Sequence, residues 1–231
     1  MMTNEVHNID CIKYMRNCPD KFFDLAIVDP PYGDAGNENQ FKGKTRFGGW
    51  FDKYKRIERT GETWSKKYKR KIIDWDIAPS KEYFIELFRV SKNQIIFGGN
   101  YFDLPPCRCF LVWEKLTISE KFSMAMCEYA WTSFFSNAKL FKYAPQNSSR
   151  FHPTQKPVEL YKWILKNYAK KGDKILDTHL GSGSSRIAAY DMGFDFVGCE
   201  IDNYYFDAQE KRYKDHIAQH NLFEFAGGIC V

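Results

Sequence analysis

Apolar residues along this 231-residue chain occur either as short continuous runs or as stripes with helical spacing. Short runs rich in branched residues predict strands buried on both faces. Segments that we expect to form strands occupy residues 6–10, 25–28, 94–97, 110–113, 128–132, 174–177 and 194–200. Helices are expected between them, at residues 11–17, 80–88, 157–171, 184–192 and 203–220.

The alternation of these strands and helices predicts an α/β fold with a doubly wound, mostly parallel sheet. The strand at 128–132 is expected to run antiparallel to a neighbour. Two segments interrupt the pattern, because residues 134–151 are polar and irregular and residues 33–72 show neither period. A structureless stretch as long as the second one is usually functional or disordered in a compact domain. The length fits one domain.

Cysteine usage and the lack of targeting signals predict a cytoplasmic protein. The seven cysteines are odd in number and scattered, without a CxxC pair, so neither a disulfide framework nor a zinc site is expected. No uncharged apolar stretch of about 18 residues occurs, and the N-terminus lacks a basic region followed by an apolar one. We therefore expect no membrane partner and no bound metal.

The tetrapeptide Asp29-Pro30-Pro31-Tyr32 directly follows the apolar run at 25–28. Consecutive prolines have no N–H to donate, so the strand must stop at Asp29, and ligands bind at such strand ends in open α/β sheets. The Asp29 carboxylate and the Pro30 carbonyl are suited to localise the lone pair of a nucleobase amino group, while Tyr32 holds the base by stacking. For the tetrapeptide alone, an acidic strand end with a Pro-Pro turn is the alternative interpretation.

A second group of residues has the layout of a nucleoside-binding half-sheet. One strand ends in Asp177, a Gly181-Ser182-Gly183 turn leads into a helix, and a later strand ends in Glu200. Glycines let the backbone approach a ligand closely, and the second acid accepts hydrogen bonds from ribose hydroxyls. Arg186 stands where a dinucleotide fingerprint requires a small residue, which counts against a pyrophosphate ligand. A plain strand-to-helix turn is the alternative for this segment alone.

Four motifs together resemble those of the S-adenosylmethionine-dependent DNA amino-methyltransferases, which methylate adenine N6 or cytosine N4. The similarity is to permuted members of that family, in which the catalytic motif precedes the cofactor motif, and it covers nearly the whole chain. The matching residues are Asp29–Tyr32, His152–Pro157, Asp177–Ser184 and Phe196–Asp202. Four motifs in the family's order form a far more specific signal than any one of them.

The resemblance implies a Rossmann-like, circularly permuted methyltransferase fold with a mostly parallel seven-stranded sheet whose last strand is antiparallel. It implies that Asp29, Pro30, Pro31 and Tyr32 are catalytic and grip a base flipped out of DNA. S-adenosylmethionine is the implied cofactor, and the residues assigned to it are Asp10, Lys156, Asp177, Gly181, Ser182, Gly183, Ser184, Glu200 and Ile201. For Asp10 alone, a surface acid at the end of a short strand is an equally good interpretation.

The sequence departs from the family in two ways. Asp177-Thr178-His179 stands where family members usually carry Asp-Pro-Phe. We interpret His179 as a packed substitute for the aromatic ring, because the glycines and Glu200 are retained, and weakened cofactor binding is the alternative. The chain also lacks a large separate target-recognition insertion.

Positive charge is concentrated directly after the tetrapeptide. The chain has a net charge of +5, yet residues 42–71 hold twelve lysines or arginines against three acids, a net of +9 that leaves −4 for the remainder. Interleaved aromatic residues make this segment suited to phosphates and bases, although a charge run is more often a solvated face. We predict a basic, DNA-contacting insertion at about 33–74 within a single domain, residues 1–231. The predicted DNA-binding residues are Lys42, Lys44, Arg46, Lys53, Lys55, Arg56, Lys66, Lys67 and Arg70.

The sequence therefore leads to the hypothesis of a site-specific DNA methyltransferase that acts on N6 of adenine. Adenine is preferred by analogy, because the family's Asp form of the tetrapeptide usually goes with adenine and a Ser form with cytosine. An N4-cytosine enzyme and a catalytically weak nucleic-acid-binding relative are the alternatives. Methylation of a protein glutamine is disfavoured by the motif order and the missing Asn. Besides DNA, a homodimer and a cognate restriction endonuclease are candidate partners.

Overall fold

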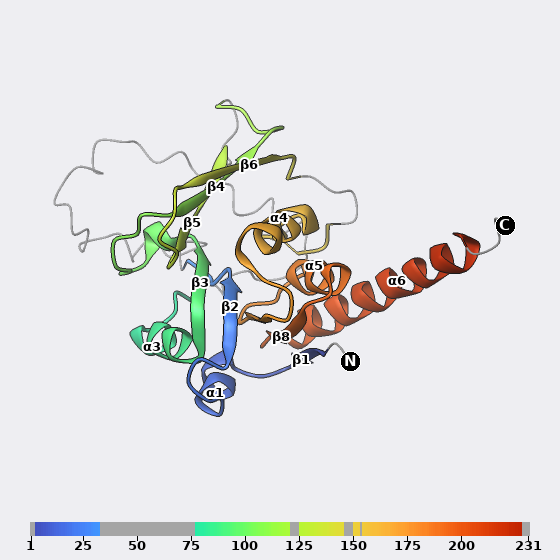
Figure 1. Ribbon diagram of the computed structural model, residues 1–231, viewed down its shortest axis with the longest axis horizontal. Coiled ribbons are helices and arrows are strands. Elements are labelled where there is room, and N and C mark those ends of the chain that lie inside the picture. Colours follow the sequence, from blue (N-terminus) through green and yellow to red (C-terminus); the bar gives the residue numbers. More distant parts are fainter. Residues whose placement is uncertain (1–2, 33–76, 121–124, 146–149, 153, 228–231) are drawn as a thin grey trace.

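The computed structural model describes residues 3–32, 77–120, 125–145, 150–152 and 154–227 (Figure 1). Its elements, in chain order, are β1 (Asn4–His7), α1 (Cys11–Arg16), β2 (Phe23–Val28), α3 (Lys81–Val90), β3 (Ser91–Phe97), the short 3-10 helix η3 (Gly99–Tyr101), β4 (Phe110–Lys115), β5 (Cys127–Thr132), β6 (Lys139–Tyr143), α4 (Val158–Tyr168), β7 (Lys174–Asp177), α5 (Ser184–Met192), β8 (Asp195–Cys199) and α6 (Asn203–Gly227). None of the helices in the described ranges combines the length and the apolar character that crossing a bilayer requires.

One sheet of eight strands runs through the molecule in the order β1-β8-β7-β2-β3-β5-β4-β6. All neighbouring pairs are parallel except the two that β5 makes, with β3 and with β4. The α/β class and the doubly wound, mostly parallel sheet are confirmed, and so is the antiparallel strand at 128–132. Two details correct the expectation. The sheet has eight strands instead of seven, because β6 pairs with β4 at the edge, and the antiparallel strand is not the last in the chain.

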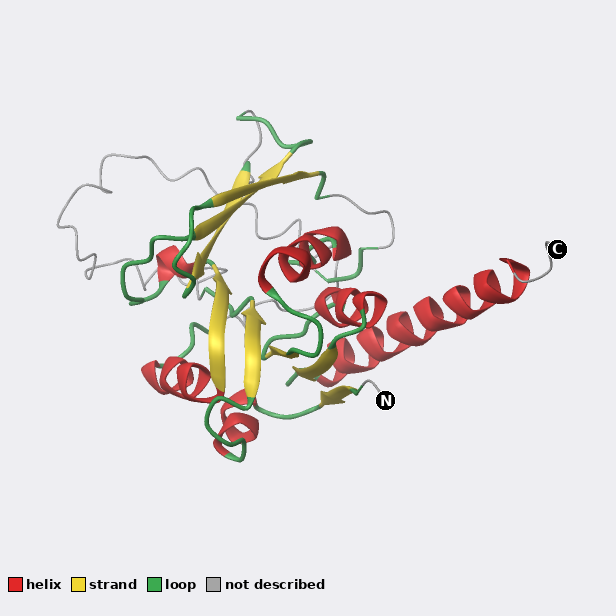
Figure 2. Ribbon diagram, viewed as in Figure 1, coloured by secondary structure: helices red, strands yellow, loops and turns green. Residues whose placement is uncertain are grey.

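The pleat of the central strands divides the hydrophobic core between two faces, and helices lie on both sides of these strands (Figure 2). On β2, Leu25 and Ile27 point to the face covered by α4 and α5, whereas Ala26 and Val28 point to the face covered by α1 and α3. All four side chains are at most 1% exposed. A strand buried on both faces must be apolar at every position, which explains the continuous run in the sequence.

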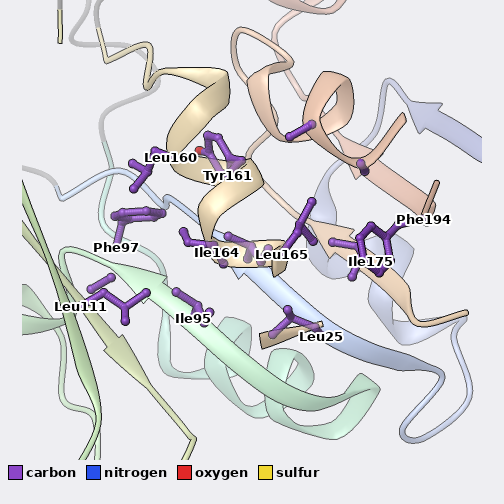
Figure 3. Packing of buried hydrophobic residues seen from close by; sticks show 14 of the residues in the cluster. Leu25, Ile95, Phe97, Leu111, Leu160, Tyr161, Ile164, Leu165, Ile175 and Phe194 are labelled. Carbon is purple, nitrogen blue, oxygen red and sulfur yellow. The ribbon is translucent and has the colours of Figure 1, made fainter. Parts of the chain in front are cut away.

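Helix α4 lies across one face of the sheet on the stripe that its sequence predicts. Tyr161, Ile164 and Leu165 are buried and pack toward strand residues such as Phe97 and Leu25 (Figure 3). Because α4 leads into the parallel strand β7, it runs back across the sheet from the carboxyl ends of the strands. The residues directly before α4 therefore lie at that edge.

The carboxyl ends of the central strands bring distant parts of the sequence together. β2 pairs in parallel with β7, with Leu25 opposite Ile175, and β7 pairs in parallel with β8. Asp29 follows β2, Asp177 ends β7 and Glu200 follows β8. Three acids that are widely separated in the chain therefore share one edge of the sheet.

Three local predictions are wrong. The first strand is Asn4–His7 instead of residues 6–10, and Asp10 instead caps α1, where its carboxylate accepts a hydrogen bond from the backbone N–H of Lys13 at 3.0 Å. Residues 139–143, expected to be irregular, form β6, an edge strand whose mostly exposed side chains give little apolar signal. The last helix continues past residue 220, to Gly227.

The buried stripe of α4 yields a stability prediction. Ile164 is fully buried, so Ile164→Ala leaves a cavity and is expected to lower the free energy of unfolding by about 2–5 kcal/mol. The matched control is Ile85→Ala, because Ile85 lies on α3 with 65% of its side chain exposed, and its expected change is within about 0.5 kcal/mol. Urea unfolding of both variants measures the difference. Equal losses would contradict the packing described for α4.

Candidate active site

Asp29 stands at the end of β2 with both carboxylate oxygens engaged. The Tyr32 hydroxyl donates to Oδ1 at 2.8 Å, and the Lys156 ammonium forms an ion pair with Oδ2. Only 15% of the Asp29 side chain is exposed. Burial raises the pKa of Asp29, while the charge of Lys156 and the hydrogen bonds from Lys156 and Tyr32 oppose that rise. The carboxylate is thereby fixed in orientation at the sheet edge.

The ring of Tyr32 is held by aromatic and backbone groups. It stacks on Tyr101 of η3, with ring centroids 4.7 Å apart and an interplanar angle of 16°, and it meets Phe102 edge-on. Gly98 has φ +64°, and a Cβ at this position would approach the Tyr32 ring to 2.2 Å. Both the left-handed backbone and the missing space require glycine here. Tyr101 is 51% exposed, so the stack reaches the surface.

Lys156 lies in the segment before α4, and only 3% of its side chain is exposed. Besides Asp29, its ammonium contacts Glu128 Oε2 of β5 at 3.2 Å, and Glu128 also pairs with Lys115 of β4 at 2.7 Å. Burial works against the ammonium, but the two carboxylates outweigh it and raise the pKa of Lys156. Burial likewise disfavours the Glu128 carboxylate, yet Lys156 and Lys115 hold its pKa below the usual value. Lys156 therefore contacts the tetrapeptide Asp29-Pro30-Pro31-Tyr32 through Asp29, and its contact with the cofactor stays a prediction.

The glycine turn follows β7 and is tied to the neighbouring strand. The backbone N–H of Gly181 donates to Glu200 Oε2 at 2.8 Å, and that of Asp202 donates to Oε1 at 2.9 Å. Asp177 accepts from the Ser185 hydroxyl at 2.5 Å and from the His179 backbone N–H at 3.0 Å. Burial raises the pKa of Asp177 to about 7, and it also raises the pKa of Glu200.

Helix α6 supports the turn from behind. Arg212 donates from Nη1 to the Ser182 carbonyl at 2.8 Å and to the Ser184 hydroxyl at 2.9 Å. Gly183 has φ +74°, and a Cβ there would lie 3.1 Å from Gln209 Cβ. Arg186, the residue at the third glycine position, is 5% exposed and donates to Asn4, Gln209 and Glu210 side chains. Arg186 therefore anchors α5 to β1 and α6 inside the protein.

The segment that begins at His152 connects the two groups of predicted residues. The His152 ring lies beside the glycine turn, where its Nε2 is 3.3 Å from the position of a Cβ on Gly181, and it packs on Tyr205 of α6. Burial lowers the pKa of His152 to about 3, so the ring is neutral. Four residues later, Lys156 reaches Asp29. One short segment therefore contacts both the glycine turn and the tetrapeptide.

The unusual Thr178-His179 pair is integrated into the core. The Thr178 hydroxyl is 2.7 Å from the Tyr83 hydroxyl and 2.9 Å from His179 Nδ1. The His179 ring meets the Tyr83 ring edge-on, with centroids 5.2 Å apart. Burial lowers the pKa of His179 to about 4, while the nearby Asp10 carboxylate opposes that shift. His179 is therefore a neutral ring packed on an aromatic neighbour.

The remaining predicted residues fall into two groups. Asp10 caps α1 close enough to act on His179, and Ile201 is 63% exposed directly after Glu200. The basic insertion at about 33–74 and all nine predicted DNA-binding residues lie outside the described residues. Within the described ranges, no three His, Cys, Asp or Glu side chains form a group that could hold a metal ion.

Sequence reasoning missed Glu128, Lys115, Gly98 and Tyr101. The sequence could have indicated a role for Glu128, because a carboxylate is unusual at the start of a run that is expected to be a core strand. A signal also existed for Gly98, since it belongs to a double glycine directly after β3. Most partners of these residues are distant in the sequence, such as Tyr32 after β2 and Lys156 before α4, so no local pattern identifies them.

The buried carboxyl group of Asp177 gives a pH prediction. Its folded-state pKa of about 7 exceeds the usual value, so ionising it costs stability progressively as pH rises from about 4 to 7. Asp177→Asn removes this cost and keeps one acceptor oxygen, while its amide NH2 replaces the other and can donate to the Ser185 hydroxyl. Thermal unfolding should show the variant gaining on the wild type between pH 5 and pH 8, by at most about 3 kcal/mol, because about two pH units of that range lie below the folded-state pKa and each corresponds to about 1.4 kcal/mol. A difference that does not change with pH would contradict this.

Comparisons with known proteins identify the family of this chain. A family model for DNA methylases of the N6/N4 type matches residues 53–211. The type II methyltransferase M.HinfI of Haemophilus influenzae is 23% identical over 255 residues, covering 92% of this chain and 68% of that protein.

Several solved structures share the fold of this chain. The M1.HpyAVI–SAM complex superposes with a TM-score of 0.54 at 19% identity, covering 90% of this chain and 98% of the other. The cytosine-N4-specific PvuII DNA methyltransferase gives a TM-score of 0.59 at 11% identity, covering 92% and 87%. The chain belongs to the S-adenosylmethionine-dependent DNA methyltransferases of the N6-adenine/N4-cytosine family.

Proposed function

We propose that this methyltransferase acts on the exocyclic N6 of adenine in DNA, at a specific site. The observation that carries the proposal is the Asp29 carboxylate, which is fixed at the end of β2 next to the strand that carries the glycine turn. The choice of adenine rests on the Asp form of the tetrapeptide, by analogy with the family. Methylation of cytosine N4 is the competing function, and the identity of the methylated nucleoside separates the two.

The groups around the glycine turn fit S-adenosylmethionine, which supplies an activated methyl group on a sulfonium. Glu200 is held by two backbone N–H groups at the end of β8, and its remaining lone pairs are suited to ribose hydroxyls. We assign the methionine end to the turn formed by Gly181, Ser182, Gly183 and Ser184, with Asp10 near the adenine of the cofactor. Arg212 holds the shape of that turn from α6.

The chain's own contribution to the reaction is positioning and electrostatics. As a carboxylate, Asp29 accepts a hydrogen bond from the target amino group, and the Pro30 carbonyl accepts the second one. These bonds localise the nitrogen lone pair and aim it at the methyl group. Tyr32 supports the flipped base by stacking. Every one of these roles requires the base to reach the edge where β2 ends.

The first test measures transfer of a labelled methyl group to DNA, followed by digestion to nucleosides. The wild type is expected to produce N6-methyl-2′-deoxyadenosine. Asp29→Ala removes the acceptor, so transfer should fall by more than about a hundredfold while cofactor affinity stays within a few fold. If the product is instead N4-methyl-2′-deoxycytidine, the target base is cytosine and the adenine proposal is wrong.

The control for this test is Asp20→Ala, because Asp20 is an exposed acid that pairs with Arg89 far from the tetrapeptide. Its activity should match the wild type. Full activity in Asp29→Ala would remove the role assigned to Asp29. Binding of DNA without any methyl incorporation in the wild type would support the nucleic-acid-binding relative instead.

We also propose that the basic segment at residues 42–71 contacts DNA. Its support is its net charge of +9, its interleaved aromatic residues and its position directly after Tyr32 in the sequence. Phosphate contacts by lysine and arginine release counterions, so they make binding depend on salt.

A triple variant tests the basic segment. Replacing Lys42, Lys44 and Arg46 with glutamine is expected to weaken DNA binding and to reduce the slope of log affinity against log salt by about 2 to 3, or about 0.9 for each phosphate that is no longer neutralised. The matched control replaces Lys166, Lys170 and Lys171, which are exposed and lie at the end of α4 that leads into the amino end of β7. Equal slopes for both triple variants would count against the proposal.

A further inference from the structure

Four charged side chains form a continuous series of ion pairs that starts within the tetrapeptide. In order they are Asp29, Lys156, Glu128 and Lys115, and we call them the charge chain. Lys156 bridges Asp29 and Glu128, and Glu128 bridges Lys156 and Lys115. The exposed fractions of the Lys156 and Lys115 side chains are 3% and 8%. The two ammonium groups are buried, whereas the side chains of Asp29 and Glu128 are 15% and 26% exposed, so the lysines depend on these carboxylates for charge compensation.

The topology of the sheet places Glu128 next to Asp29. Strand β5 is antiparallel to β3, with Ala130 opposite Phe97, so the start of β5 lies at the edge where β3 ends. Glu128 stands two residues before Ala130 and therefore extends beyond the end of β3. Lys115 ends β4, which runs antiparallel to β5, and so reaches the same edge. The ammonium of Lys156 fills the space between, 4.7 Å from the centroid of the Phe97 ring.

A buried ammonium is stable only where carboxylates compensate its charge. Lys156 has two carboxylate partners, and only Asp29 belongs to the tetrapeptide. Glu128 therefore holds Lys156 in place independently of Asp29. Removing one member of such a network leaves an uncompensated buried charge.

We propose that Lys156 and Glu128 are positioning residues for methyl transfer: Lys156 keeps Asp29 an ionised, oriented acceptor for the target amino group, and Glu128 holds Lys156 there. The inference rests on the catalytic role proposed for Asp29. A carboxylate accepts hydrogen bonds at both oxygens, whereas a carboxylic acid turns one oxygen into a donor. A protonated Asp29 would face the N–H groups of the target with a donor and lose its function.

Several titratable groups face Asp29 from the surrounding elements. Within the described residues these are Lys156, Glu128 of β5, Tyr32, Asp177 of β7 and Tyr161 of α4. Burial and the negative charge of Glu128 raise the pKa of Asp29, and Lys156 is the cation that opposes them. Removing Lys156 must therefore raise this pKa, and removing the charge of Glu128 must lower it.

The experiment measures the single-turnover rate of methyl transfer against pH, at saturating S-adenosylmethionine and DNA. Lys156→Met is expected to move the acidic limb of the profile upward by about one to three pH units. The rate at pH 7 then falls at least about tenfold and recovers at least partly at alkaline pH. Glu128→Gln keeps an oxygen that can accept from Lys156 and removes only the negative charge, so its limb is expected to move in the opposite direction. Lys156→Arg keeps the charge, so its limb should stay near that of the wild type.

Two controls separate this role from others. Lys92→Met removes a surface lysine that pairs with Asp24 at the other end of β2, and its profile should match the wild type. Calorimetry with S-adenosylmethionine distinguishes positioning from cofactor binding. If Lys156 instead binds the cofactor, Lys156→Met lowers the affinity for S-adenosylmethionine and leaves the acidic limb of the pH profile unchanged. This result would overturn the inference.

The remaining outcomes are also decisive. Should Lys156→Met fail to fold, Lys156→Gln takes its place, because it keeps a hydrogen-bond donor toward Asp29 but removes the charge; an upward shift of its limb supports the inference and an unshifted limb refutes it. An inactive Asp29→Ala combined with an unshifted limb in Lys156→Met rejects this inference alone. A fully active Asp29→Ala rejects the proposed role of Asp29 and this inference together.

Discussion

The parallel pairing of β2 with β7 is the contact on which the candidate site depends. Its register sets Leu25 opposite Ile175 and Ala26 opposite Leu176, although these residues are 150 positions apart. Both strands are buried on two faces, so a shift by one residue would turn apolar side chains to the wrong layer. The hydrophobic core therefore fixes the distance between the tetrapeptide after β2 and the glycine turn after β7.

The segment from His152 to Lys156 adds a second connection between the same two groups. One end packs against the glycine turn and α6 through His152, and the other end reaches Asp29 through Lys156. Because α4 begins directly after this segment, the position of the segment follows from the packing of the α4 stripe on the sheet. The stability of the core and the geometry of the site are therefore linked.

Much of this arrangement could be predicted because it follows from local patterns. The run at Leu25–Val28 is apolar throughout, and the prolines after it locate Asp29 at a strand end. In contrast, β6 is an edge strand that is mostly exposed, so its sequence carries little signal. The contacts of Lys156 with Glu128 depend on the order and direction of β3, β4 and β5, which no local pattern encodes. Asp10 was expected to end a strand, but an aspartate is also a favoured helix cap, and that role prevails.

Gly98 shows how backbone, rather than side chains, can shape a site. The Tyr32 ring fills the volume that a side chain at this position would take, so main-chain atoms form part of the wall behind the ring. Main-chain atoms have no rotamers to change. The plane of the ring is consequently set when the protein folds, and the associated loss of conformational entropy does not recur when a flat ligand settles against it.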